Sequence, residues 1–211
     1  MIARMKSPAT VHVVDDDASV RKSLSRLISE AGYRVQAYTS AGEFLARAPE
    51  AGPSCLVLDV RMPGATGLEL QQTLAAAVHE IPIIFITGHG DISMSVKAMK
   101  AGAVDFLTKP FVARELLDAI ERAVAKDARD LGTEARDDEI RGRLKRLTPR
   151  ESQVFALVVT GMLNKQIASE LGIGEKTVKV HRARVMEKMQ AGSVAALVRL
   201  ADAVGIIVTK V

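Results

Sequence analysis

The stretch that decides the fold is VHVVDDDASV, residues 11–20. Its apolar start is typical of a buried strand, and three adjacent aspartates, Asp15, Asp16 and Asp17, follow directly. Like charges this close repel one another, so a packed cluster of them is expected to take up a proton or to bind a cation. Asp17 is predicted to cap the helix that follows rather than to act as a ligand.

Four more short apolar runs follow along the chain, and each is separated from the next by a segment with helical spacing. With the first run at residues 10–15, the predicted strands are residues 33–38, 55–59, 81–87 and 103–108. Five strand–helix units of this kind predict an α/β domain with a five-stranded parallel, doubly wound (flavodoxin-like) sheet that is covered on both faces. The helix signals are a stop at Gly32, a capping-box pair Ser40–Glu43, a third helix over about residues 68–78, an N-cap at Asp91 and a fifth helix after Pro110.

Charge divides the chain, whose 211 residues allow two modest domains. Residues 1–126 and 127–146 are each neutral, so the whole net charge of +4 lies on residues 147–211. A small basic domain beside a neutral one suggests a polyanion partner such as nucleic acid or a membrane surface. Scattered surface charge is the alternative, because four charges are few. The single cysteine, Cys55, excludes an internal disulfide, and no apolar run reaches the ~20 residues that span a bilayer. We therefore expect a cytoplasmic protein with no membrane partner.

The remaining segments are predicted to be helical. Residues 127–146 form a charged linker, which is expected to be partly helical and to be weakened at Gly132 and Gly142. Residues 147–211 are predicted to hold four helices, and the second and third of these, around the LGIG turn, favour a helix-turn-helix. Their signals are the Thr148–Pro149–Glu151 start of the first helix and, for the second, a cap at Asn164 and a stop at Gly172.

Polar side chains follow the predicted strands at the edge of the sheet where parallel α/β folds place their sites. These side chains are the carboxylates of Asp15, Asp16 and Asp59, the hydroxyl of Thr87 and the ammonium of Lys109. Carboxylates suit Mg²⁺ or Mn²⁺, and Lys109 and Thr87 could hold a phosphoryl group. Asp59 is the candidate nucleophile, forming an aspartyl phosphate. Without a glycine-rich phosphate loop, another protein is the expected phosphate donor.

The third helix of the last segment, residues 175–189, has one apolar face formed by Val178, Val185 and Met189. Its opposite face carries basic and small residues, which fits the major groove of DNA. Lys179 and Val180 are predicted to reach base edges, while Arg182 is predicted to brace the domain. The full set of predicted DNA contacts is Lys165, Lys176, Thr177, Lys179, Val180, His181 and Arg184.

The motifs together resemble a known family. VVDDD (13–17), CLVLDVRMPG (55–64), FITGHGD (85–91) and AGAVDFLTKPF (101–111) are similar to the receiver domain of two-component response regulators, in particular the FixJ branch. LTPRESQVFALVVTGMLNKQIASELGIGEKTVKVHRARVMEKM (147–189) resembles the LuxR-type helix-turn-helix of the NarL/FixJ family. The resemblance implies that Asp59 is phosphorylated by a sensor histidine kinase and that the main-chain carbonyl of Arg61 joins the metal site. It also implies that Thr87 and Phe106 form a switch, and Phe106 lacks the hydroxyl of the tyrosine that is common at its position.

The predicted function is a phosphorylation-controlled, DNA-binding transcription regulator that is not an enzyme. Phosphorylation is expected to drive homodimerisation, and the dimer is expected to read palindromic or paired half-sites on double-stranded DNA, with RNA polymerase as a further partner. One alternative is a DNA-binding regulator whose receiver only dimerises, without control by phosphorylation. Others are a helical adaptor that binds no DNA and a Mg²⁺-dependent phosphohydrolase that uses the same acids.

Overall fold

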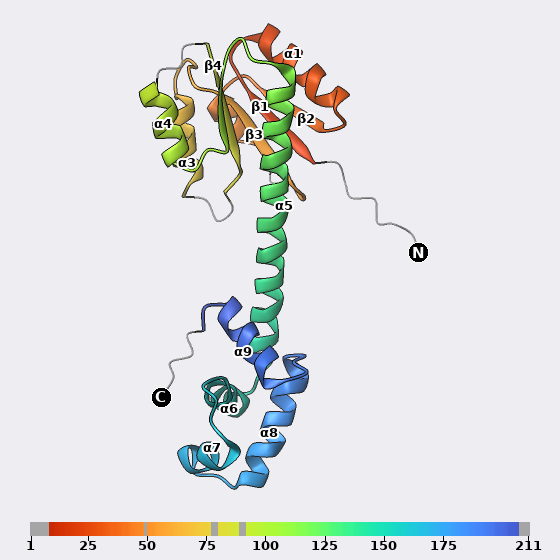
Figure 1. Cartoon of the computed structure of the whole chain (residues 1–211), viewed down its shortest axis with the longest axis vertical. Helices are drawn as coiled ribbons and strands as arrows, with labels where there is room; N and C mark the ends of the chain where they lie inside the picture. Colours follow the sequence, from red (N-terminus) through yellow and green to blue (C-terminus); the bar gives the residue numbers. More distant parts are fainter. Residues whose placement is uncertain (1–8, 49, 77–79, 89–91, 207–211) are drawn as a thin grey trace. The chain divides into compact units, whose positions relative to one another are not determined.

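The computed structural model of the chain describes residues 9–48, 50–76, 80–88 and 92–206 (Figure 1). The chain divides into two compact units, Met1–Leu131 and Gly132–Val211. The border between them falls inside the segment that the sequence predicts to be a linker. Within the described part of the chain, no helix has both the length and the apolar character needed to cross a bilayer.

The first unit contains the predicted five-stranded parallel sheet, with the strand order β2-β1-β3-β4-β5. This order brings the ends of β1 and β3 next to each other, with β4 and β5 following on one side (Figure 1). The strands are β1 (Thr10–Val14), β2 (Arg34–Tyr38), β3 (Ser54–Asp59), β4 (Ile83–Thr87) and β5 (Asp105–Thr108). The sequence prediction of the fold is therefore confirmed, with strand bounds that differ by at most two residues at either end.

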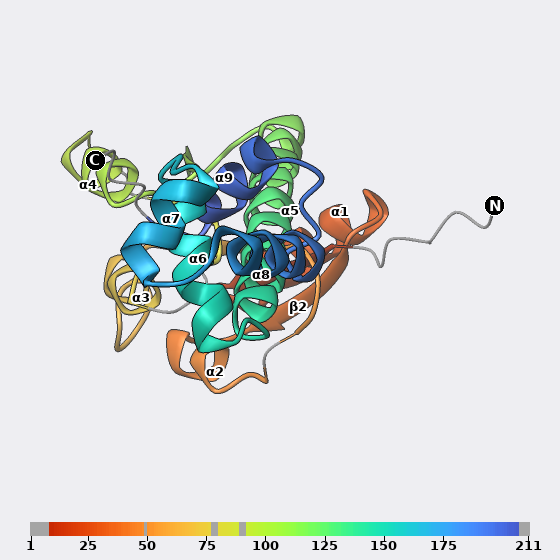
Figure 2. The same ribbon diagram turned by 90° about the horizontal axis from the view of Figure 1, so that it is seen from below.

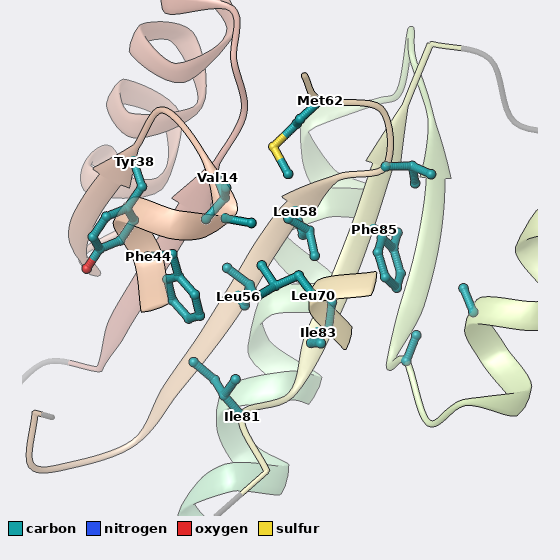
Figure 3. Packing of buried hydrophobic residues seen from close by; sticks show 14 residues of the cluster. Val14, Tyr38, Phe44, Leu56, Leu58, Met62, Leu70, Ile81, Ile83 and Phe85 are labelled. Carbon is teal, nitrogen blue, oxygen red and sulfur yellow. The ribbon is translucent and has the colours of Figure 1, made fainter. Parts of the chain in front are cut away.

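Helices cover both faces of this sheet because the strand residues alternate between two apolar cores. On one face, Val13 and Val57 pack with residues of α1 (Ala18–Glu30) and α5 (Ala113–Leu144). On the other, Leu58 and Phe85 pack with residues of α2 (Ala41–Leu45), α3 (Gly67–Leu74) and α4 (Ile92–Lys100). Figure 3 shows this second core, in which Leu70 of α3 lies over the strands. The buried cores fix the strand ends that carry the candidate site.

The helix starts test several sequence predictions. Asp17 caps α1 as predicted, because its side chain accepts hydrogen bonds from the amides of Ser19 (2.7 Å) and Val20 (3.2 Å). Ser40 caps α2, but the predicted capping box is wrong, because the Glu43 carboxylate instead accepts from the amide and hydroxyl of Thr39. The third helix begins as predicted and ends at Leu74, earlier than predicted, and the N-cap predicted at Asp91 lies outside the described residues.

The second unit contains the four predicted helices, and α5 runs into it as far as Leu144, through both Gly132 and Gly142. Helix α8 packs against α6 and α7, and α9 packs against α6 (Figures 1 and 2). The helices are α6 (Pro149–Val159), α7 (Asn164–Leu171), α8 (Glu175–Lys188) and α9 (Val194–Ala203).

Two of the three predicted helix signals in this unit are confirmed. Thr148 and Glu151 form a complete capping box with Pro149 in the first turn of α6. Gly172 ends α7 in the left-handed conformation, with φ of 64°, which favours glycine. The cap predicted at Asn164 is wrong, because Asn164 is the first residue inside α7 and Leu163 is at the N-cap.

Candidate functional site

Two buried carboxylates and one ammonium group meet at the carboxyl ends of the strands. Asp15 follows β1 and Asp59 ends β3, and their residues are 1% and 6% exposed. The Nζ atom of Lys109, which follows β5, lies 2.8 Å from Oδ2 of Asp15 and 3.1 Å from Oδ1 of Asp59. The structure thus brings together three of the predicted site residues, from three different strands.

The second oxygen of each carboxylate is bound to the main chain. Oδ1 of Asp15 accepts a hydrogen bond from the amide of Asp17 at 2.9 Å, and Oδ2 of Asp59 accepts one from the amide of Arg61 at 3.0 Å. The Arg21 guanidinium also donates to the main-chain oxygen of Asp15 at 2.6 Å. Because each carboxylate is bonded at both oxygens, both are held in fixed orientations.

Burial and charge act in opposite directions on the acid at the centre. Burial raises the pKa of Asp59 above its ordinary value, while the Lys109 ammonium opposes the rise and the Asp15 charge adds to it. For Lys109, burial lowers the pKa, but the bonds to Asp15 and Asp59 outweigh burial, so its pKa is raised overall. Lys109 therefore keeps its charge, and it screens two acids that would otherwise repel each other.

Thr87 and Phe106 lie on β4 and β5, the two strands that follow β3 in the sheet. Thr87 ends β4 and is 1% exposed, and its main-chain oxygen accepts from the Lys109 amide at 2.7 Å. Phe106 of β5 is half-buried and stands opposite Phe85 of β4, with their ring centroids 6.2 Å apart. A shift of Phe106 is therefore coupled to an aromatic ring inside the core.

A close backbone contact at Gly67, which the sequence analysis did not single out, shapes the loop after Asp59. The Gly67 amide donates to the main-chain oxygen of Val60 at 3.0 Å. A Cβ atom on Gly67 would lie 2.5 Å from the main-chain oxygen of Asp59 and 3.1 Å from the Phe85 ring. Only glycine fits there without a shift of the backbone. The sequence marks a helix start here through Thr66 and Glu69 but says nothing of this contact.

The donor set fits a hard cation with few protein ligands. Over the part of the chain that the structure describes, no three His, Cys, Asp or Glu side chains lie close enough together to hold a metal ion. Asp15 and Asp59 are within reach of the same Lys109 atom, whereas Asp16 is exposed. Mg²⁺ usually binds one or two carboxylates and keeps several waters, so the two buried acids suit it.

In the second unit, α8 presents the predicted faces. Val178, Val185 and Met189 are fully buried, as expected. Most of the predicted contact residues are exposed, namely Lys165 of α7 and Lys176, Thr177, Lys179, Val180 and Arg184 of α8. His181 is half-buried, and its Nδ1 atom finds no hydrogen-bond partner among the described residues.

Arg182 braces the two helices of the turn, as the sequence predicts. Its guanidinium donates to the side-chain oxygen of Asn164 at 2.9 Å. This bond, which joins α8 to the start of α7, explains why the Asn164 side chain does not cap its own helix. The brace holds the exposed face of α8 in a fixed orientation to α7.

Two family models match this chain. Residues 11–121 match the family described as "Response regulator receiver domain", and residues 145–201 match "Bacterial regulatory proteins, luxR family". The chain belongs to the response regulator family. It is a DNA-binding transcriptional response regulator with a receiver and a LuxR-type domain, and it is not an enzyme, which removes the phosphohydrolase alternative.

Relatives and solved structures resemble this response regulator over nearly its whole length. Nodulation protein W of Bradyrhizobium diazoefficiens is 50% identical over 94% of this chain and 87% of its own. Transcriptional regulatory protein FixJ of Rhizobium meliloti is 50% identical over 93% of this chain and 96% of its own. The structure of response regulator StyR matches with a TM-score of 0.82 and 50% identity, over 93% of this chain and 99% of that one.

Proposed function

We propose that this response regulator is switched by a phosphoryl group that a sensor histidine kinase transfers to Asp59. An Oδ atom of Asp59 attacks the phosphorus of a phosphorylated imidazole. The new P–O bond forms as the P–N bond breaks, and the electron pair of that bond returns to the imidazole nitrogen, which takes a proton from solvent. The observation that carries the proposal is the fixed, buried Asp59 carboxylate 3.1 Å from the Lys109 ammonium.

Mg²⁺ or Mn²⁺ is the proposed cofactor of this transfer. Asp15 and Asp59 would hold the ion, together with Asp16 and the main-chain carbonyl of Arg61. When bound, the ion neutralises negative charge on the phosphoryl oxygens. The positive charge of the ion would also offset part of the negative charge of the two acids, which Lys109 otherwise neutralises. The Lys109 ammonium would then be available to bind the phosphoryl group.

The output of the switch is proposed to pass through Thr87 and Phe106. A phosphoryl group adds charge and acceptor oxygens at one fixed point, and the Thr87 hydroxyl at the next strand end is suited to donate to them. Because Phe106 has no hydroxyl, its change of position is read by packing, against Phe85, rather than by a hydrogen bond. The charge added at Asp59 would thus favour one of two packing arrangements of the surface around Phe106.

The surface proposed to dimerise lies on α4 and the strand and helix that follow it. Ile92, Val96 and Met99 of α4 are 83%, 43% and 45% exposed, which leaves an apolar stripe open to a second copy. Next to it in the fold, Asp105 of β5 pairs with Arg122 of α5 at 2.5 Å. An exposed apolar stripe with charged groups beside it suits a regulated, reversible contact between two receivers.

Two copies of α8 are proposed to read paired half-sites on double-stranded DNA. Binding there would either recruit RNA polymerase to a promoter or exclude it. Lys179 and Val180 would reach base edges, where the valine methyl groups suit a thymine methyl. The predicted phosphate contacts are Lys165, Lys176 and Arg184, and Thr177 and His181 complete the contact set. Dimerisation raises the effective concentration of the second domain at its half-site.

The test is phosphorylation of the full chain with Mg²⁺ and acetyl phosphate, followed by mass, light scattering and DNA retention. A gain of one phosphoryl mass is expected in the wild type and in Asp118→Asn, an exposed control, but not in Asp59→Asn. The gain should be accompanied by dimer formation and tighter DNA binding. A chain that dimerises and binds DNA equally well with and without the modification would support the alternative of a receiver that only dimerises.

A further inference from the structure

The C-terminal end of the recognition helix α8 is bonded to the linker helix. Met189, the residue that follows α8, is fully buried, and its main-chain oxygen accepts a hydrogen bond from the Arg143 guanidinium at 3.1 Å. The last carbonyls of a helix have no partner inside the helix, and a cation there is favourable. Arg143 belongs to the last turn of α5, so a linker residue supplies what the end of α8 lacks.

A second set of bonds ties the same end of α8 to the segment between α5 and α6. The Nζ atom of Lys188 lies 3.1 Å from the main-chain oxygen of Arg146 and 2.6 Å from Oε2 of Glu151. The Glu151 side chain is 3% exposed and also accepts from the Thr148 amide. The Lys188 hydrogen bond, with that amide, lowers the pKa of Glu151 to about 2, so this pair stays charged at neutral pH.

Arg143 is itself held in place. Its side chain is only 16% exposed, and a second guanidinium nitrogen lies 2.7 Å from Oε1 of Glu139, one turn earlier in α5. Ile140 and Leu144, on either side of it, pack in the same apolar core as Met189. The luxR family match begins at residue 145, so Arg143 itself lies just before the matched residues.

We propose that Arg143 is a positioning residue for DNA binding, which fixes the C-terminal end of α8 so that its exposed face enters the groove at the correct tilt. Arg182 braces the helix nearer its middle, and Arg143 fixes the far end. Met189 lies seven residues beyond Arg182, which at 1.5 Å per residue is ~10 Å of helix. If the bond from Arg143 is lost, α8 can rotate about the remaining brace at Arg182, and the exposed face that carries Lys179 then changes its tilt relative to the base edge it is proposed to read.

The competing explanation is that Arg143 contacts a DNA phosphate directly. Its side chain is only 16% exposed and is held by two protein partners, the main-chain oxygen of Met189 and the carboxylate of Glu139, and both facts favour the positioning role. The two roles differ in one measurable way. Loss of a phosphate contact lowers the slope of log affinity against log salt by about 1, whereas loss of a positioning bond leaves the slope unchanged.

The experiment compares Arg143→Met with Arg141→Met in the full chain. Both remove one positive charge from the same helix, but Arg141 is exposed and makes no hydrogen bond or ion pair with α8 among the described residues. The probe is a duplex selected from a random library by the wild-type protein, with poly(dI-dC) as non-specific DNA. We expect Arg143→Met to weaken binding to the selected duplex about tenfold, the effect of one lost charged hydrogen bond, with an unchanged salt slope. Arg141→Met should bind like the wild type.

Amide hydrogen exchange at the end of α8 supplies a readout that does not depend on DNA. Exchange at Gln190 and Ala191 should speed up in Arg143→Met and not in Arg141→Met. Arg143→Lys, which keeps one donor, should restore part of the affinity and of the protection, and it replaces Arg143→Met if that variant fails to fold.

A salt slope that falls by about 1, or equal affinities for the two methionine variants, would overturn the proposal. The proposal rests on the proposed placement of α8 on DNA, which Lys179→Ala tests separately. If that variant keeps full affinity and discrimination, the placement of α8 fails, whatever Arg143→Met does.

Discussion

The Nζ atom of Lys109 lies 3.1 Å from Oδ1 of Asp59, so the proposed phosphoacceptor is already in an ion pair in the unmodified protein. The same ammonium also contacts Asp15 at 2.8 Å. A positive charge that serves two buried acids is a stabilising element of the resting fold as well as a candidate ligand for phosphate. Its removal should therefore have consequences that can be measured without any phosphodonor.

Lys109→Met is expected to destabilise the receiver by about 1–3 kcal/mol in the absence of divalent cations. The two acids lose their counter-charge, and the loss is smaller than for a fully buried pair because the Lys109 side chain is 26% exposed. Added Mg²⁺ should restore more stability to the variant than to the wild type, because a cation replaces the ammonium. Thermal unfolding with and without Mg²⁺ measures both effects. Lys126→Met, which removes an exposed pair with Asp130, should change stability by less than about 0.5 kcal/mol.

Gly67→Ala is expected to cost about 1–3 kcal/mol and to slow phosphorylation of Asp59. The new methyl group would lie 2.5 Å from the main-chain oxygen of Asp59, so the loop or the strand end must shift. Gly42→Ala in α2 is the control, since the nearest atom there is 3.9 Å away. That change should stabilise the protein by about 0.4–1 kcal/mol. Urea unfolding and the rate of mass gain with acetyl phosphate check the two parts, and equal phosphorylation rates in both variants would contradict the role of Gly67.

The receiver is expected to lose stability as the pH falls from 6.5 to about 4, because His12 is buried in its neutral form. Burial and the nearby Arg47 lower the pKa of His12 from 6.5 to about 4, against a smaller opposing effect of Glu50, and its Nδ1 atom lies 3.2 Å from the Tyr38 hydroxyl. The unfolded chain binds a proton in this window and the folded one does not, so the loss approaches roughly 3 kcal/mol at the lower end.

The pH effect of His12 can be isolated by comparison with His12→Gln. Urea unfolding over this pH range should show a shallower decline for the variant, because glutamine does not titrate. Parallel curves for the two proteins would show that other groups cause the decline.

The proposed phosphate contacts and base contacts of α8 should differ in how their loss changes affinity, salt dependence and sequence discrimination. Lys176→Ala should weaken binding to all sequences and lower the salt slope by about 1. Val180→Ala should reduce discrimination at one base position, by less than the ~1–3 kcal/mol of a bidentate hydrogen-bonding pair, and leave the slope unchanged. Both residues are exposed in the free protein, so neither change should lower the melting temperature. Binding titrations over several salt concentrations, against single-base variants of a selected duplex, make the comparison.

Regular patterns in the chain predict much of this fold. Alternating apolar runs predict the strands, and the acids, hydroxyl and ammonium at their ends predict which side chains gather, because parallel strands finish at one edge. The Asp17 and Thr148 caps follow from local sequence alone. Where a residue has a partner far along the chain, local rules fail. Asn164 bonds to Arg182 instead of capping α7.

Contacts set by tertiary packing leave no trace in the local pattern. Gly67 is one glycine among 15, and only the folded loop brings it against Asp59. Gln71 is a polar residue in an amphipathic segment, yet it is buried and donates to the carbonyls of Ala98 and Ala101 near the end of α4. Likewise, the charged segment around Arg143 looks like a solvated linker, although part of it belongs to a core.

The course of α5 has a practical meaning for the exchange of modules between regulators. The receiver match ends at residue 121 and the luxR match begins at residue 145, so the sequence families suggest that the segment between them is interchangeable. Ile140 and Leu144 nevertheless pack in the core of the second unit, and Arg143 is hydrogen-bonded to Met189 there. A chimera joined just before residue 145 would take residues 140–144 from another regulator, so the C-terminal end of α8 would lose its contact with Arg143. A more suitable crossover region is the stretch 132–136, in which every residue is exposed.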